Sequence, residues 1–337
     1  MTALVTTVTE TLRYRGALGQ WSWVLHRLTG LGVVFFFVLH VIDTSWAVFY
    51  PDLYERAIAS YQSPLFTLGE FGLVAAVVYH AINGLRIIFL DYRPHLWRYQ
   101  QRAAIYVLIV TIIILVPVFV LMFGHVLDFY NTIPQVLPLV EVVVDQLPFI
   151  AGMAVALIVS IFFSAIYGLI AGNRAAARTN RNMGSPMERF WWSYMRISGL
   201  VIVPLVFGHL AMMHVLQGVF DLTAQGHSIV GVGGVVNESG TAVEFISQRW
   251  NFLVAGVAFW RLYDFALLAL VAVHGFNGLR YVLTDYTMSS PLMRRAMVYL
   301  CIIGATVLLV LGTGALLGTI DSAAIEMAEQ AAQNLHP

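Results

Sequence analysis

Residues 80–92 read HAINGLRIIFLDY and residues 274–286 read HGFNGLRYVLTDY, so one pattern occurs twice in the chain. Each copy lies at the end of a long apolar run. The pattern therefore places one histidine, His80 or His274, inside a membrane about 1.5 helical turns before an arginine that marks the membrane edge. A buried histidine on a membrane helix needs a partner, and two equivalent histidines suggest that they share one.

A glycine follows each of these histidines four positions later, as Gly84 and Gly278, and lies on the same helix face. The missing side chain leaves a flat slot beside the imidazole, which suits a haem macrocycle. The alternative is a pair of small-residue packing faces whose histidines bond to neighbouring helices. Repetition of Asn, Gly, Arg, Asp and Tyr in register favours the cofactor.

Composition places the chain in a membrane. It has 337 residues, of which 59% are hydrophobic and 11% charged, with a mean hydropathy of +0.79. The single cysteine, Cys301, excludes a disulfide framework and an iron–sulfur cluster made by this chain alone. The zero net charge says little about partners, and no nucleic-acid partner is expected.

Apolar runs predict seven crossings, at about 23–49, 68–90, 103–125, 148–171, 197–219, 254–284 and 296–319. Positive charge orients them, because 15 of the 18 arginines fall on one side. These are Arg13, Arg15, Arg27, Arg86, Arg93, Arg98, Arg102, Arg174, Arg178, Arg181, Arg189, Arg196, Arg280, Arg294 and Arg295. The positive-inside rule then predicts a cytosolic amino terminus and an outer carboxyl terminus.

The repeat extends beyond its signature, since residues 25–31 (LHRLTGL) align with residues 194–200 (YMRISGL). We therefore predict an all-α polytopic membrane bundle of two three-helix units, related by a pseudo-twofold axis along the membrane normal, plus one linker transmembrane helix. The predicted divisions are a first haem-binding unit at 1–130, an outer loop, linker helix and cytosolic loop at 131–184, a second haem-binding unit at 185–320, and an outer amphipathic tail at 321–337.

A second pair of histidines follows the same symmetry. His40 lies 13 residues after Arg27, and His209 lies 13 residues after Arg196, which puts both roughly 20 Å deep at the helical rise. Equivalent helices of the two units are expected to face one another across the axis, so histidines at equal depth should meet. The prediction is two bis-histidine haem b sites, one from His80 and His274 near the cytosol and one from the deeper pair.

A rival to His209 lies five residues later at His214. Five residues turn an α-helix by about 140°, so the two side chains are expected on different faces. His209 is favoured because it matches His40 and because Gly208 beside it opens space. Glu70, at the outer entry of its helix, is interpreted as a solvated helix end, with proton exchange near the outer haem as the alternative.

These motifs carry a resemblance to a known family. The order His-Arg-x-Thr-Gly at 26–30, Tyr-His with Gly-x-Arg and Asp at 79–91, and His-x-x-x-Gly with Leu-Thr-Asp-Tyr at 274–286 resembles the cytochrome b membrane anchor of succinate dehydrogenase and fumarate reductase. The chain resembles both anchor subunits of that family fused head to tail. The likeness leaves out the linker helix, the loop 220–250 and the tail.

The resemblance implies a bacterial cytoplasmic membrane protein that passes electrons from a docked iron–sulfur subunit, itself bound to a flavoprotein, to membrane quinone. It implies one or two haems b, and menaquinone rather than ubiquinone. A higher oligomer of the complex is a further implication. The departure from the family is the single chain with seven crossings.

The resemblance also assigns residues. It gives His26, Arg27 and Arg196 to the haem propionates or the quinone, where the alternative is ordinary positive-inside anchors. It gives the quinone a site near the cytosolic surface, at Arg27 with Asp285 and Tyr286. Trp23 is either a wall of that site or an interfacial belt residue.

Two other functions remain open. A di-haem cytochrome b of another quinone-linked redox complex would share the haems and the topology, but it would not explain the doubled Asn-Gly-Leu-Arg with Asp-Tyr. A haem-free seven-helix membrane protein is the alternative from a different class.

Overall fold

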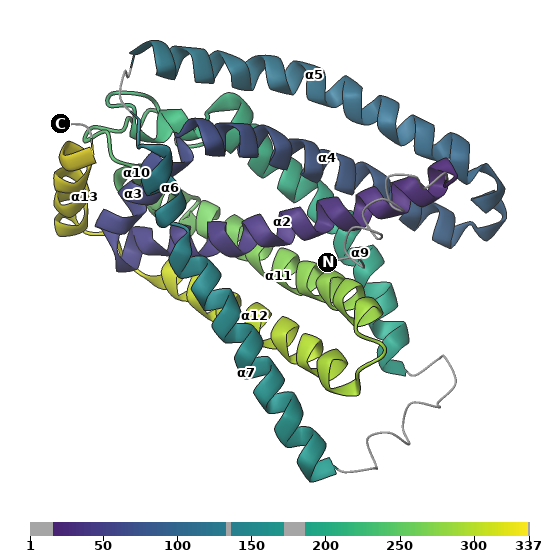
Figure 1. Ribbon diagram of the computed structural model, residues 1–337. Coiled ribbons are helices and arrows are strands. Elements are labelled where there is room, and N and C mark those ends of the chain that lie inside the picture. Colours follow the sequence, from purple (N-terminus) through teal and green to yellow (C-terminus); the bar gives the residue numbers. More distant parts are fainter. Residues whose placement is uncertain (1–15, 133–135, 172–185, 336–337) are drawn as a thin grey trace.

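The computed structural model describes residues 16–132, 136–171 and 186–335 (Figure 1). Seven helical segments among them are long and apolar enough to cross a membrane, which confirms the predicted all-α, multi-pass architecture. In order they contain α2 (Leu18–Phe49), α4 (Pro64–Tyr92), η1 (Pro94–Tyr99) with α5 (Gln100–Thr132), α6 (Leu139–Val144) with α7 (Leu147–Ala171), α9 (Pro186–Leu210) with η3 (Ala211–Leu216), α11 (Phe259–Tyr286) and α12 (Pro291–Leu317).

The first and last groups of three helices each pack together. Helix α4 lies between α2 and α5, and α11 packs on both α9 and α12. Across the two groups, α2 contacts α11 and α12, while α4 contacts α9. Helix α2, which carries His40, therefore packs against α11, which carries His274. Helix α4, which carries His80, packs against α9, which carries His209. The pseudo-twofold axis and the unit boundaries 1–130 and 185–320 stay predictions.

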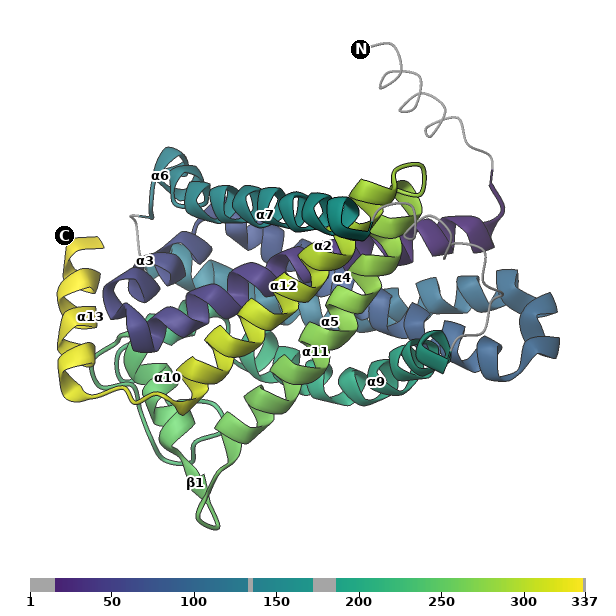
Figure 2. The same ribbon diagram turned by 90° about the horizontal axis from the view of Figure 1, so that it is seen from below.

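The linker helix α7 lies along α12, as Figure 2 shows. Two serines make this approach close, because Ser160 and Ser164 are both fully buried. The Ser164 hydroxyl donates to the carbonyl of Leu292 at 2.6 Å. The linker is thus a packed wall of the second unit.

Short elements from three separate parts of the chain form a cap at one end of the bundle (Figures 1 and 2). They are α3 (Pro51–Tyr61), η4 (Val219–Thr223), α10 (Ala242–Asn251), the hairpin β1 (Leu253–Val254) and β2 (Val257–Ala258), and α13 (Ser322–Leu335). Phe245, Trp250 and Tyr54 are buried in its core.

The tail forms helix α13 and packs on the protein. Asp321 caps its start, since the Oδ1 of Asp321 accepts the Ala324 amide at 3.0 Å. Helix α13 packs on α3 and α10 and buries Ala324 and Ala328. Its apolar face therefore covers the cap, and the outer position of the tail stays a prediction.

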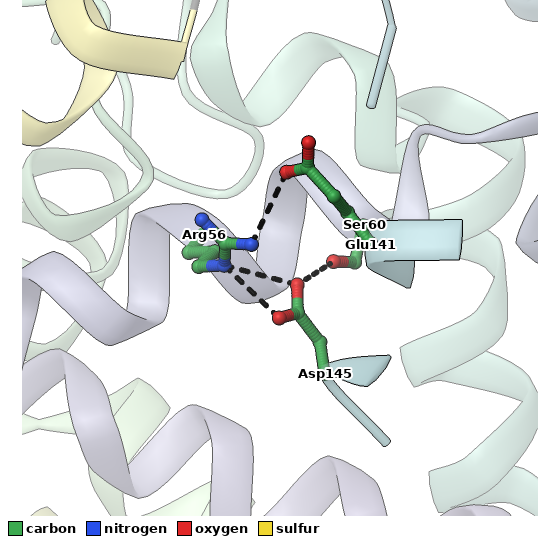
Figure 3. Close-up of polar contacts among 4 residues, drawn as sticks. All are labelled: Arg56, Ser60, Glu141 and Asp145. Atoms are coloured by element: carbon green, nitrogen blue, oxygen red, sulfur yellow. Dashed lines mark hydrogen bonds and ion pairs between the residues drawn. The ribbon is translucent and has the colours of Figure 1, made fainter. Parts of the chain in front are cut away.

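A polar cluster ties the cap to the start of the linker segment (Figure 3). The Nε of Arg56 on α3 donates to both carboxylate oxygens of Asp145 at 3.0 and 3.1 Å, and its Nη2 reaches Glu141 at 3.3 Å. Ser60 also donates to Asp145 at 3.2 Å. Arg56 therefore partly neutralises the two acidic side chains.

Five arginines used to orient the chain, Arg13, Arg15, Arg174, Arg178 and Arg181, lie outside the described residues. The cytosolic position of the amino terminus stays a prediction.

Candidate functional site

The inner histidines, His80 on α4 and His274 on α11, are held by the helix that precedes each of them in its own unit. The Nδ1 of His80 lies 3.1 Å from the carbonyl oxygen of His26 on α2. The Nδ1 of His274 lies 2.9 Å from the hydroxyl of Ser198 on α9. The second histidine repeats the arrangement of the first.

These contacts fix the same tautomer on both rings. A carbonyl oxygen only accepts, so His80 must carry its proton on Nδ1. The Ser198 hydroxyl donates its single proton to the Tyr194 carbonyl at 2.6 Å, so it accepts from Nδ1 of His274. Each Nε2 is left with its lone pair and makes no hydrogen bond within the described residues, which is the state of a histidine that ligates a metal.

Two glycines that the sequence analysis did not single out allow the close approach. A Cβ on Gly30 would lie 2.8 Å from Cε1 of His80, and one on Gly199 would lie 3.3 Å from Cε1 of His274. Both glycines occupy the same place in the repeated Arg-x-Thr/Ser-Gly motif. That repetition was the signal that could have identified them.

The predicted slots beside Gly84 and Gly278 are lined by side chains of the preceding helices. His26 Cε1 lies 3.6 Å from a Cβ built on Gly84, and Met195 Cε lies 3.7 Å from one built on Gly278. The ring of His26 also stacks on that of His80, with 4.0 Å between centroids and 7° between planes. These glycines therefore meet His26 and Met195, and their predicted contact with a cofactor stays a prediction.

The inner histidines of the two units lie within electrostatic range of each other. His80 and His274 interact electrostatically, and His26 interacts with both. The structure thus brings the predicted inner pair together from separate halves of the chain. That they share one iron stays a prediction.

A cavity of ≈ 530 Å³ lies beneath the cap, and His40, His209 and His214 all line it. Glycines on two helices, Gly32 on α2 with Gly69 and Gly72 on α4, also line it, and a Cβ on any of them would meet nothing within 4 Å. These glycines leave backbone exposed to the cavity, as a flat ligand requires.

The outer imidazoles have a spacing that fits a shared metal. The ring centroids of His40 and His209 lie 5.9 Å apart with the planes at 74°. Two imidazoles on opposite sides of one metal hold their centroids ~6 Å apart, since each metal–nitrogen bond is about 2 Å long.

The expectation that His209 and His214 face different ways is wrong. Their ring centroids are 6.3 Å apart and both line the cavity, because the helix loosens into a π turn, η3, just beyond His209. A π turn bonds residue i to i+5 rather than i+4, so residues five apart return to one face. The Gln217 amide indeed binds the Met212 carbonyl at 3.1 Å.

Two further expectations about this region are corrected. Glu70 is not a solvated helix end, because its Oε1 accepts from Nδ1 of His214 at 2.6 Å and its side chain is 13% exposed. The space expected beside Gly208 is filled by Tyr263, whose hydroxyl lies 3.0 Å from a Cβ built there.

Three of the four predicted quinone-site residues meet at the opposite end of the bundle. Arg27 forms an ion pair with Asp285 at 2.5 Å and lies 3.9 Å above the ring of Trp23. The fourth, Tyr286, is 76% exposed at the end of α11.

The same cluster occurs a second time with the units exchanged. Arg196 pairs with Asp91 at 2.5 Å and lies 4.0 Å above the ring of Trp192. Each arginine thus binds an aspartate from the other unit. Both arginines predicted for propionates or quinone therefore already hold a carboxylate of the chain.

Comparisons with known proteins show the family of the chain. A family model described as the succinate dehydrogenase/fumarate reductase transmembrane subunit matches residues 6–121 and 171–314. The chain is 37% identical over 118 residues to the succinate dehydrogenase 2 membrane subunit SdhC of Mycobacterium tuberculosis, covering 35% of this chain and 87% of that protein. It is 32% identical over 74 residues to the succinate dehydrogenase hydrophobic membrane anchor subunit of Halobacterium salinarum, covering 22% of this chain and 57% of that protein. No solved structure matches the chain.

Proposed function

Because this chain belongs to the succinate dehydrogenase/fumarate reductase transmembrane subunit family, we propose that it is the cytochrome b membrane anchor of a succinate:quinone oxidoreductase. It docks an iron–sulfur subunit, which is bound to a flavoprotein, on its cytosolic face and serves membrane quinone, preferably menaquinone. The family match over two separate stretches supports an anchor in which two subunits are fused.

The observation that carries the proposal is the shared tautomer of the inner histidines. A metal ligand needs Nε2 free and Nδ1 anchored, and His80 and His274 meet both conditions through different acceptors.

The residues of the chain fit haem b at two levels. His80 and His274 would hold the inner group, and His40 with His209 would hold the outer one in the cavity beside Gly32. His214 remains the alternative outer ligand, since Glu70 anchors its Nδ1 in the same way. The chemistry that bound haem b supplies is one-electron transfer between the iron–sulfur subunit and the quinone.

Quinone binds, in this proposal, at the cluster of Arg27, Trp23, Asp285 and Tyr286. The Arg27 guanidinium and the Tyr286 hydroxyl donate hydrogen bonds to the quinone carbonyls. Asp285, whose side chain is 49% exposed, takes up a proton from the solvent and passes it to the quinone as the quinone is reduced. The indole of Trp23 forms an apolar wall and holds the guanidinium by a cation–π contact.

Purification from native membranes in mild detergent tests the assignment. A flavin-bearing protein and a cluster-bearing protein should elute with the chain, and the preparation should reduce quinone with succinate as electron donor. Elution without either partner would contradict the anchor role. A preparation with other partners and a different electron donor would favour another quinone-linked complex.

A further inference from the structure

One positive charge beside the inner histidines has no counterion within the described residues. The Nε and Nη1 of Arg86 are buried and make no hydrogen bond. Arg86 interacts electrostatically with His26 and with Tyr79, and neither carries a negative charge at neutral pH. A guanidinium stays protonated in proteins, so the charge of Arg86 cannot be removed by loss of a proton.

Comparable arginines near this end of the bundle have partners for part of their guanidinium. Arg27 and Arg196 bind Asp285 and Asp91. Arg280, which holds the position of Arg86 in the second unit, donates from Nε to the neutral Asn277 at 3.0 Å. Arg295 leaves its Nε buried without a hydrogen bond, but its Nη2 lies 3.5 Å from the Ser164 carbonyl. Arg86 differs because two of its nitrogens are buried without a partner, and the repeated motif alone does not cause this, since Arg280 has a partner for its Nε.

A second unpaired polar atom lies near it. The Nδ1 of His26 is buried without a hydrogen-bond partner, while the ring stacks on His80 and interacts electrostatically with both His274 and Arg86. His26 thus offers a buried nitrogen beside His80, and Arg86 offers two more about 1.5 helical turns nearer the membrane edge. Buried unpaired polar atoms are rare and costly, and a guanidinium only donates, so they indicate an acceptor that the chain does not supply.

We propose that Arg86, with His26 beside it, holds a carboxylate of the inner cofactor, namely a haem propionate. This inference rests on the proposed function. It moves the propionate partner from Arg27 and Arg196, which already bind aspartates, to an arginine that the sequence analysis treated only as a membrane-edge anchor. Arg86 is a positioning residue that neutralises the propionate and fixes the plane of the group.

The test uses the complete complex with Arg86→Gln, Arg86→Lys and the matched control Arg280→Gln. Haem per chain, the midpoint potential of each haem and its dependence on pH are measured, and the inner haem is identified as the one lost in His80→Ala. Removal of a positive charge disfavours the reduced, more negative haem. Arg86→Gln should therefore lower the midpoint potential of the inner haem or lose that haem.

The control and the conservative variant sharpen the result. Arg280→Gln should leave both haems at their wild-type potentials, and Arg86→Lys should restore most of the potential because it keeps the charge. Unchanged haem content and potentials in Arg86→Gln would overturn the inference. So would a loss of bound anionic phospholipid with unchanged haems, since the anion would then be a lipid phosphate. A wild-type complex without haem would instead refute the proposed function.

Discussion

The acceptor beside each inner imidazole, a hydroxyl in one unit and a backbone carbonyl in the other, fixes which ring nitrogen carries the proton. Thr29 and Ser198 each donate to the carbonyl four residues earlier, at 2.7 and 2.6 Å, which leaves their oxygen lone pairs facing the histidine of the next helix. In the second unit Ser198 is the acceptor for His274. In the first unit the His26 carbonyl takes that place, and Thr29 lies farther away at 3.5 Å.

Replacement of Ser198 by alanine should therefore weaken inner haem binding. His274 would lose the acceptor that fixes its tautomer, and partners of this kind typically contribute 10–100-fold in affinity. The measurement is haem retained during transfer to an apo-haem acceptor protein. Ser160→Ala is the matched control, because Ser160 makes the same bond to its own helix at 2.7 Å, and that helix, α7, contains no histidine. Equal retention in both variants would contradict the role of Ser198.

A buried carboxyl makes the cap sensitive to pH. Glu55 is 2% exposed, and burial raises its pKa from 4.5 to about 7, although the amides of Val243 and Ala242 bind it and oppose the rise. The folded cap thus holds this proton more tightly than the unfolded chain does. Its contribution to stability is complete below pH 4.5 and is lost as pH rises through 7.

The cap should accordingly become less stable across that window, by at most roughly 3 kcal/mol. Hydrogen exchange of α10 amides, measured at several pH values, checks this. In Glu55→Gln, whose amide oxygen still accepts from Val243, the slope should disappear. A slope that survives in this variant would assign the effect to other groups.

At the scale of helices, close approach decides which side chains meet. Gly30 lets α2 lie against the ring of His80, since a Cβ would lie only 2.8 Å from it. The π turn acts in the opposite way, because it widens α9 so that two histidines face one cavity.

Gly30→Ala should displace His80 and lose the inner haem while leaving the outer one. Alanine is otherwise the better helix former, so helix propensity alone would predict a gain in stability. Gly152→Ala on α7 is the control, since a Cβ there meets nothing within 4 Å. The readout is haem per chain after purification. A Gly30→Ala protein with its full haem content would show that the ring has room to move.

The sequence predicted the positions of the membrane-spanning helices better than the contacts between side chains. Hydropathy located all seven crossings, because a lipid environment demands long apolar runs. The repeat paired His80 with His274, and the family resemblance grouped Arg27 with Asp285; the haem and quinone roles of these residues stay predictions. The π turn was not predictable, since it changes hydrogen-bond pattern without changing the apolar pattern. The cap was missed because its three segments are far apart in the chain, and amphipathicity does not tell which surface covers α13.

At the scale of the whole molecule, reciprocal ion pairs join the two halves. Arg27 reaches Asp285, and Arg196 reaches Asp91. Such crossing contacts are what the proposed pseudo-twofold axis requires. The two clusters differ in exposure, with Asp285 at 49% and Asp91 at 16%. Only the more exposed cluster is proposed to bind quinone.

The matched pair Asp285→Asn and Asp91→Asn tests this difference. Each change removes one ion pair, which should lower stability by about 1 kcal/mol at most. Quinone reduction should fall strongly in Asp285→Asn, because the proton donor is lost, and stay near wild type in Asp91→Asn. Quinone reduction is measured as the initial rate with saturating succinate, and the melting temperature of each variant checks that it is folded. Equal losses in both variants would make the clusters purely structural.

The central claim is that imidazoles from the two halves of the chain bind common irons. The most direct measurement is the reduced-minus-oxidised absorbance spectrum of the purified complex, with haem quantified per chain, for the wild type, His80→Ala and His274→Ala. We predict two haems b per chain in the wild type and loss of the same single haem in each variant. A wild type without haem, or variants that keep every haem with unaltered axial ligation, would contradict the claim.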